Sequence, residues 1–250
     1  DGVVDLLGRL KDAGKDLYVV TNDASKSPET MSRPFCGTSQ GDLLPPDRFI
    51  NSGLMARDYL REKIREGKVA YLGKPDSAFY IEDAGLQPVP VLECPEDEDI
   101  KAVVLLDDEG FDWQPTLNHV LNILRRRWVP VVVANSDPAY PVNDRHVAIA
   151  VGSLGDLMQG LVRKRFIWFG KPDAYMFSFA YTQAQLNNPG LAKRDILMVG
   201  DTLLTDILGG NKFGIDTALV LSGNTDPGHY RQLCEACGVF PDFVSSSILE

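Results

Sequence analysis

Residues 196–207 read Ile-Leu-Met-Val-Gly-Asp-Thr-Leu-Leu-Thr-Asp-Ile, a short apolar run that ends at a glycine and an aspartate. Similar β-branched and apolar runs occur at 17–21, 102–106, 130–134, 166–169 and 217–221. Nearly continuous apolar runs of this length predict strands buried on both faces, which is typical of a parallel sheet covered by helices. Helical patterns alternate with them, because apolar residues recur at helical spacing from Val3 to Leu10 before Gly14. The sequence therefore predicts an α/β protein with a doubly wound parallel sheet.

The middle of the chain predicts a second, smaller α/β unit. It has strand candidates of its own at 69–72, 102–106 and 131–134, and helix candidates at 116–126 and 154–162. We therefore assign residues 1–65 and 165–250 to a core domain and residues 66–164 to an inserted α/β domain.

The composition excludes several classes of protein. The chain has 250 residues, of which 44% are hydrophobic and 24% charged, as in ordinary globular proteins. No apolar run reaches the roughly 18 to 20 residues of a membrane helix, and residues 1–10 lack the pattern of a signal peptide. With a net charge of −10 and only short basic groups such as 125–127, the chain is not expected to bind nucleic acid. We expect a cytoplasmic protein that does not bind membranes.

Cys234 and Cys237 form a C-x-x-C pair. A structural zinc site needs four ligands, and no second cysteine pair or nearby histidine pair completes one. We interpret the pair as two thiols on a late helix.

Polar residues that could bind a ligand or take part in catalysis follow three of the predicted strands. In parallel α/β sheets, ligands bind at these strand ends. Thr21-Asn22-Asp23 combines a hydroxyl with successive backbone N–H groups, an arrangement that can bind an anion. The alternative is that Ser27 simply caps the following helix. Lys171 stands on a strand-to-helix turn, where it could meet a phosphate or lie at the surface.

The third strand end carries Asp201 and, five residues later, Asp206. Two carboxylates at such a place suit Mg²⁺, which favours carboxylate and water oxygens. The alternative is a turn aspartate followed by an aspartate in the first turn of a helix.

Taken in order, these three strand ends resemble the last three motifs of the haloacid dehalogenase (HAD) superfamily. The residues Thr21-Asn22, Gly170-Lys171-Pro172 and Thr205-Asp206-Ile207 resemble the branch that includes p-nitrophenyl phosphatases, pyridoxal phosphatases and the bacterial N-acetylglucosamine-operon phosphatase. That branch carries a large α/β cap between the threonine and lysine motifs, and the insert 66–164 has its size and position.

Two segments of the insert bear on this resemblance. Residues 135–138, Asn-Ser-Asp-Pro, resemble a cap segment of the same branch. Gly-Lys-Pro-Asp occurs at 73–76 as well as at 170–173, and the first copy falls inside the cap, so it is not expected to be the catalytic one.

The resemblance implies a Mg²⁺-dependent phosphatase that hydrolyses small phosphomonoesters through an aspartyl phosphate, and it implies a role for each motif. Thr21 and the N–H groups of Asn22 and Asp23 would bind phosphate oxygens, Lys171 would neutralise charge, Asp201 and Asp206 would serve the metal, and Asn135 and Asp137 would help the cap choose the substrate. Asp23 stands where the branch often has a second asparagine, which places a negative charge near an anion site. The expected partner is a small phosphorylated metabolite, and pairing of two caps in a homodimer is common in the branch.

The resemblance also implies an Asp-x-Asp motif, whose first aspartate attacks phosphorus, at the end of the first strand. Asp1-Gly2 is not expected to be this motif, because one helix and one strand fill the interval up to Thr21. We expect the native protein to have roughly 15 to 25 further residues before residue 1, enough for a strand and its connection. That strand would lie in the middle of the sheet, between the strands that end at Thr21 and Gly200.

Two other readings stay open at this point. If the nucleophile is absent from the native protein, the remaining motifs could bind an anion without turnover, as in a scaffold protein. A dehalogenase or phosphomutase is less well supported, because dehalogenases need no Mg²⁺ and mutases more often carry a smaller cap.

Overall fold

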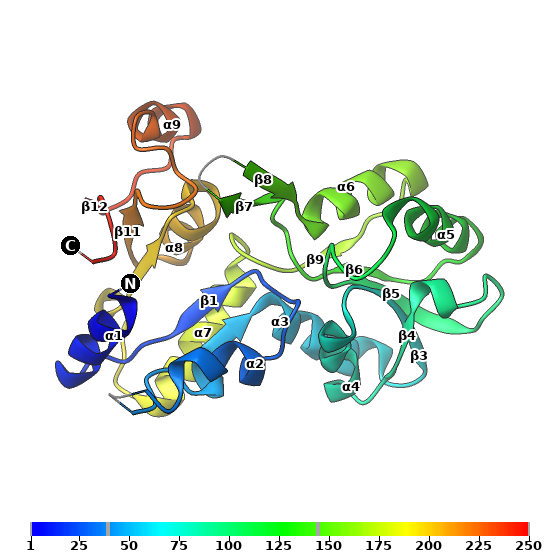
Figure 1. The fold of residues 1–250 in the computed structure, drawn as a ribbon, viewed down its shortest axis with the longest axis horizontal. Helices are drawn as coiled ribbons and strands as arrows, with labels where there is room; N and C mark the ends of the chain where they lie inside the picture. Colours follow the sequence, from blue (N-terminus) through cyan, green and yellow to red (C-terminus); the bar gives the residue numbers. More distant parts are fainter. Residues whose placement is uncertain (1, 39–40, 144–145, 250) are drawn as a thin grey trace. The chain divides into compact units, whose positions relative to one another are not determined.

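The computed structural model describes residues 2–38, 41–143 and 146–249, which form two compact units (Figure 1). Unit 1 consists of Asp1–Val20, Ser32–Ile50 and Lys171–Glu250, and unit 2 of Thr21–Met31 and Asn51–Gly170. The interpretation of Asp1 falls outside the described residues.

Unit 2 is built on a parallel sheet of five strands. Its order is β4 (Gln87–Pro90), β3 (Lys68–Leu72), β5 (Ile100–Leu105), β6 (Val131–Val133) and β9 (Ile167–Trp168). The three middle strands are rich in valine, alanine and leucine and are almost entirely buried, as expected of a parallel sheet covered on both faces. Helices α5 (Trp113–Arg126) and α6 (Val151–Val162) cover one face, and α3 (Ser52–Tyr59) and α4 (Phe79–Asp83) cover the other (Figure 1).

The spacing of apolar residues explains how the helices of unit 2 pack. In α5, Thr116, Val120, Ile123 and Leu124 recur every three or four residues and are buried. They join the core cluster that α6 and the strands β3, β5 and β6 also form. Unit 2 also contains the short helix α2 (Pro28–Ser32) and the antiparallel pair β7 (Ala139–Asn143) and β8 (His146–Ile149).

Unit 1 contains two sheets in its described part. One is a parallel sheet with the order β10 (Leu197–Gly200), β11 (Asp216–Val220) and β12 (Phe243–Ser245), and the other joins β1 (Val19–Thr21) to β2 (Phe49–Asn51). The helices are α1 (Val3–Asp12), α7 (Ala174–Asn187), α8 (Leu208–Phe213) and α9 (Tyr230–Cys237). Leu203, Ile207, Leu219, Cys234 and Val239 form the core under β11 and α9. The predicted α/β class with parallel sheets is confirmed.

The outer edge of β10 pairs with no strand among residues 2–38, 41–143 and 146–249. Leu197 and Val199 point to the same face because side chains alternate along a strand, and they are 49% and 38% exposed. Apolar side chains are rarely left so open in a parallel sheet. The edge of β10 that is unpaired in the described residues is therefore the edge at which a further strand is expected from the sequence.

The predicted boundaries of the insert, 66 and 164, differ from this division into units. Strand β9 pairs with β6, through Val132 and Ile167, and so belongs with unit 2. Helix α3 also belongs there, because Gly53 packs directly on the Tyr80 ring and Asn51 Nδ2 donates to Tyr80 Oη at 2.7 Å. Apolar runs predict strands but do not show which sheet each strand joins, so the predicted boundaries differ from the division into units.

Within the described parts of the chain, every helix is too short or too polar to cross a membrane. Cys234 and Cys237 lie on α9, as predicted for two thiols on a late helix. Cys234 is buried and Cys237 is exposed.

Candidate active site

Lys171 lies at the centre of the polar contacts in unit 1. Its Nζ is 2.7 Å from Asp206 Oδ1 and donates to the carbonyl oxygen of Val20 at 2.8 Å. The side chains of Lys171 and Asp206 are 13% and 5% exposed, so this ion pair is largely shielded from water. Two predicted motif residues thus meet directly, and Lys171 also contacts the residue that precedes Thr21 in the chain.

The segment after β10 positions both acidic residues. Asp206 lies in the π-helical turn Leu203–Ile207, and its Oδ2 accepts a hydrogen bond from Thr202 N at 3.1 Å. A side chain at Gly200 would collide with the Asp206 carboxylate, so glycine is needed at this strand end. Irregular helical turns of this kind often occur at functional sites.

A loop that follows β11 holds Asp201. Asn224 N donates to Asp201 Oδ2 at 2.7 Å, and Thr225 donates to the carbonyl oxygen of Asp201 through both N and Oγ1. Gly223 approaches so closely that a Cβ there would collide with Asp201 Oδ2. This loop is not among the predicted site segments, although it follows the predicted strand 217–221.

Asp201 and Asp206 offer oxygen ligands of the kind that Mg²⁺ prefers, and Mg²⁺ often takes only one or two protein carboxylates, with water and phosphate as further ligands. Thr202 links the two side chains, because its N donates to Asp206 and its Oγ1 to Asp201 Oδ1 at 3.3 Å. No cluster of three or more His, Cys, Asp or Glu residues that could hold a metal is present in the described residues. The chemistry of the two donors fits Mg²⁺, but these residues alone do not form a complete metal site.

The Thr21–Ser27 segment of unit 2 forms a tight, hydrogen-bonded loop. Asp23 N donates to Thr21 Oγ1 at 3.2 Å, and the Asp23 carboxylate accepts from Ser25 N at 2.8 Å. Thr30 N donates to Ser27 Oγ at 3.3 Å, so Ser27 caps α2 as the alternative interpretation holds. The cap does not compete with an anion site, because it uses the last residue of the loop and not Thr21.

Asn22 is the best-anchored residue of this loop and is only 3% exposed. Its Nδ2 donates to Asp137 Oδ1 at 2.9 Å and to Ser136 Oγ at 3.3 Å. Asn135 Oδ1 accepts from Asp137 N at 2.7 Å and so holds the turn that carries Asp137. The structure therefore brings Asn135 and Asp137 together with Asn22, while their predicted role in choosing the substrate stays a prediction.

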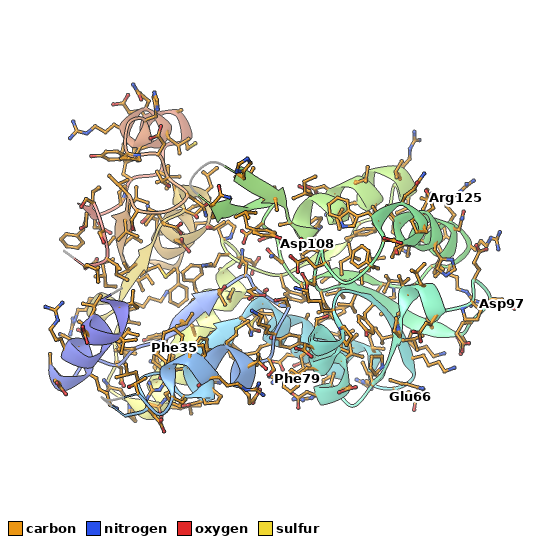
Figure 2. The ribbon with its side chains drawn as sticks, viewed as in Figure 1. Phe35, Glu66, Phe79, Asp97, Asp108 and Arg125 are labelled. Atoms are coloured by element: carbon orange, nitrogen blue, oxygen red, sulfur yellow. The ribbon has the colours of Figure 1, made fainter. Side chains whose placement is uncertain are left out.

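The first Gly-Lys-Pro-Asp segment, at 73–76, lies at the carboxyl end of β3 in unit 2. Lys74 pairs with Glu109, and its Nζ is 4.0 Å from Asp107 Oδ2. Burial raises the pKa of Asp107 and of Asp108, whereas the hydrogen bond from Lys74 lowers the pKa of Glu109. Tyr140 in β7 donates to Asp108 Oδ2 at 3.2 Å; Asp108 is labelled in Figure 2. Both copies of the segment thus place a lysine against carboxylates, but Lys74 is much more exposed than Lys171.

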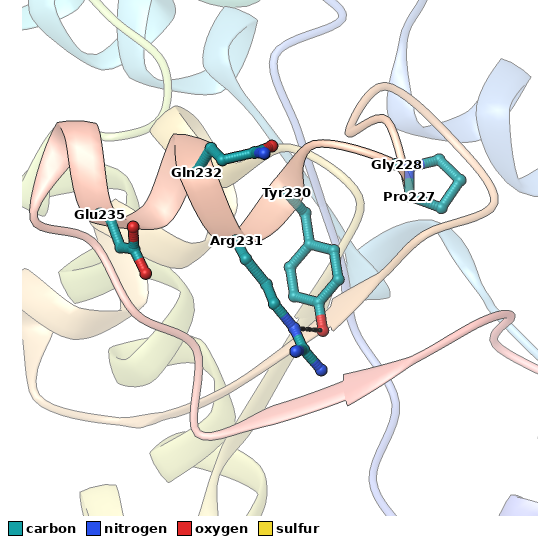
Figure 3. Close-up of a pocket in the computed structure, with 6 residues that line it drawn as sticks. All are labelled: Pro227, Gly228, Tyr230, Arg231, Gln232 and Glu235. Atoms are coloured by element: carbon teal, nitrogen blue, oxygen red, sulfur yellow. Dashed lines mark hydrogen bonds between the residues drawn. The ribbon is translucent and has the colours of Figure 1, made fainter.

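A cavity of about 370 Å³ lies beside α9 in unit 1 (Figure 3). In Figure 3 the Arg231 side chain is turned toward Tyr230, whose Oη accepts a hydrogen bond from Arg231 Nε at 3.1 Å. The lining residues are Pro227, Gly228, Tyr230, Arg231, Gln232 and Glu235. None of them is a predicted site residue, so this cavity is separate from the candidate chemistry.

Comparison with known proteins identifies the family. Residues 1–87 match a family model described as haloacid dehalogenase-like hydrolase, and residues 168–250 match one described as HAD-hydrolase-like. Chronophin from Bos taurus is 30% identical over 233 residues, which are 89% of this chain and 75% of that protein. Glycerol-3-phosphate phosphatase from Gallus gallus is 28% identical over 98% of this chain and 82% of that protein.

A solved structure extends the likeness to the whole fold. The structure of a possible sugar phosphatase of the HAD superfamily from Cytophaga hutchinsonii is 42% identical, with a TM-score of 0.92. The match covers 100% of this chain and 88% of that one. These identities over most of both chains confirm the family that the three motifs predicted. The chain belongs to the haloacid dehalogenase-like hydrolases.

Proposed function

We propose that this protein is a phosphatase that hydrolyses small phosphomonoesters. The observation that carries the proposal is the position of Lys171, which pairs with Asp206 and also donates to the carbonyl oxygen of Val20 in β1. A fixed ammonium group between two strand ends is suited to neutralise the negative charge of a transferring phosphoryl group. The relatives named as phosphatases support the same reaction class.

Each remaining motif has a part in the proposed reaction. The Thr21 hydroxyl and the backbone N–H groups of the Thr21–Asp23 loop bind phosphate oxygens, as successive N–H groups do in other anion sites. Asp201, held by Asn224 and Thr225, together with Asp206 would hold Mg²⁺. When bound, Mg²⁺ would offset the negative charge of the phosphate and of the carboxylates around it.

The nucleophile is proposed to lie on a strand that precedes residue 1 and pairs with the outer edge of β10. The exposed Leu197 and Val199 and the unpaired edge of β10 in the described residues support this position. A first aspartate there would form a bond to phosphorus while the bond to the ester oxygen breaks, and a second would protonate that leaving oxygen. Water activated by the second aspartate would then attack phosphorus and release phosphate and the free first aspartate.

The test uses the full-length protein with p-nitrophenyl phosphate, glycerol 3-phosphate and a sugar phosphate, with Mg²⁺ and with EDTA. We expect Mg²⁺-dependent turnover that Asp201→Asn reduces by about 100-fold or more, because it removes a charged ligand of the metal. Asp216→Asn is the matched control, since Asp216 is exposed at the opposite end of the neighbouring strand β11. Binding of phosphate without turnover of any ester would instead favour the non-catalytic alternative.

A further inference from the structure

We infer that Asp137 is a positioning residue that fixes Asn22 and, through it, the backbone of the Thr21–Asp23 loop. This inference rests on the proposed function, in which that loop binds the phosphate group. It gives Asp137 a role other than contact with the substrate, and it assigns the Asn22 side chain to Asp137 and not to the phosphate.

Three hydrogen bonds join Asn22 to other residues of unit 2. Its amide nitrogen donates to Asp137 Oδ1 at 2.9 Å and to Ser136 Oγ at 3.3 Å, and its carbonyl oxygen accepts from Ser52 Oγ at 2.8 Å. Asn22 is therefore held at its side chain by the turn after β6 and at its backbone by the first residue of α3. Such bonds at both ends leave the peptide groups next to Thr21 little freedom to rotate.

Gly170 packs closely against the Asn22 side chain. A Cβ at Gly170 would lie 2.9 Å from Asn22 Oδ1 and 2.8 Å from Ser136 Oγ, and Gly170 has a φ of 128° that only glycine adopts easily. A side chain at Gly152 would collide with the carbonyl oxygen of Asp137, so α6 packs directly against the turn that carries the carboxylate. The turn is further held by Asn135, whose Oδ1 accepts from Asp137 N.

Removing the Asp137 carboxylate should leave the buried Asn22 amide without its main acceptor. A buried amide without an acceptor destabilises the folded state unless it moves to reach water. We expect the adjoining loop to shift with it. Because an anion site depends on the directions of successive N–H groups, a small rotation at Asn22 weakens phosphate binding and the step that follows it.

The experiment compares Asp137→Ala, Asp137→Asn, Asn22→Ala and the double variant Asn22→Ala/Asp137→Ala in the full-length protein. The readouts are kcat and KM for p-nitrophenyl phosphate, the dissociation constant of inorganic phosphate from calorimetry, and Tm. Asp97→Ala is the control, because Asp97 is an exposed carboxylate of the same unit. All assays are run at least 15 °C below the lowest Tm, so that every variant is folded.

We expect Asp137→Ala to lower kcat/KM and to weaken phosphate binding by about 10- to 100-fold, the range that follows from leaving a buried polar group unsatisfied. Asp137→Asn keeps an acceptor oxygen and should stay within about threefold of the wild type. The double variant should be no worse than Asn22→Ala alone, because Asp137 acts through Asn22.

Three outcomes would overturn the inference. One is an Asp137→Ala variant with a lower Tm but unchanged kcat/KM and phosphate affinity, since that is a structural role only. Another is additive losses in the double variant. The third concerns a wild-type protein that hydrolyses no ester, in which case the proposed function fails but the role of Asp137 can still be tested by phosphate binding. Weaker phosphate binding in Asp137→Ala than in the wild type then supports the inference. Equal binding, or no binding by either protein, overturns it.

Discussion

Replacing Lys171 by alanine should destabilise the protein as well as inactivate it. The ammonium group lies 2.7 Å from Asp206 Oδ1, and the two side chains are 13% and 5% exposed. At this distance the Coulomb attraction is about 6 kcal/mol for an effective dielectric constant of about 20. Most of that attraction is offset by the desolvation of both groups, so the pair itself contributes little net stability.

The cost of the substitution arises from the charge that remains. Without Lys171 the Asp206 carboxylate stays buried, and among the described residues the Thr202 N–H is the hydrogen-bond donor left to it. Removing one partner of a buried ion pair costs about 3 to 5 kcal/mol. For a chain of this length that corresponds to a fall in Tm of roughly 6 to 20 °C, which differential scanning calorimetry resolves easily.

A second variant separates this explanation from a general loss of packing. Lys171→Ala/Asp206→Asn removes the negative charge that Lys171→Ala leaves buried and unpaired. We therefore expect the double variant to recover at least half of the lost stability while remaining inactive. Lys74→Ala is the matched control, because Lys74 occupies the same position in the other Gly-Lys-Pro-Asp segment but is 41% exposed and should cost only about 1 kcal/mol. A Lys171→Ala variant with the wild-type Tm, or a double variant no more stable than the single one, would refute the reasoning.

Three further predictions concern the loop after β11, the metal and the effect of pH. Gly223→Ala should reduce kcat at least 10-fold by pushing the Asp201 carboxylate aside, whereas Gly228→Ala, where a Cβ meets only ordinary contacts, should leave kcat unchanged in the same assay. The concentration of Mg²⁺ that gives half-maximal turnover should rise at least 10-fold in Asp201→Asn, and a titration with unchanged half-saturation would remove Asp201 from the metal site. Burial raises the pKa of Asp107 in the folded protein, so the folded state keeps this proton at a higher pH than the unfolded chain does. Stability should therefore fall as pH rises above about 4, and Asp107→Asn should flatten this part of the Tm curve between pH 4 and pH 7; parallel curves would contradict the assignment.

Local patterns in the sequence predicted most of the regular elements. The apolar run 102–106 predicted strand β5, which spans Ile100–Leu105. The helical pattern 116–126 predicted most of helix α5, which spans Trp113–Arg126. Helix α6 begins three residues earlier than predicted, at Val151, because Ala150 precedes it without a side-chain cap that the sequence could reveal. Such elements are predictable since their signals come from neighbouring residues and the spacing of apolar side chains.

The order of the three strand-end motifs also predicted the family. The sequence did not reveal that Lys171 contacts Asp206 in particular, or that Asn224 and Thr225 hold Asp201. These contacts join residues that are 23 or more positions apart, and nothing in the local pattern distinguishes one distant carboxylate from another. The loop at 223–225 was missed because glycine and asparagine after a strand also mark ordinary turns.

The sequence by itself therefore determined the α/β class and the family, and it located polar residues at the ends of predicted strands. Only the tertiary structure decided that β9 joins the sheet of unit 2, that Asn22 is held by Asp137, and that the two sheets of unit 1 remain separate in the described residues. The physical reason is that hydrophobic periodicity is a local property of the chain. The partner of a strand, and the acceptor of a buried amide, depend instead on which distant segments pack together to bury apolar surface and satisfy polar groups.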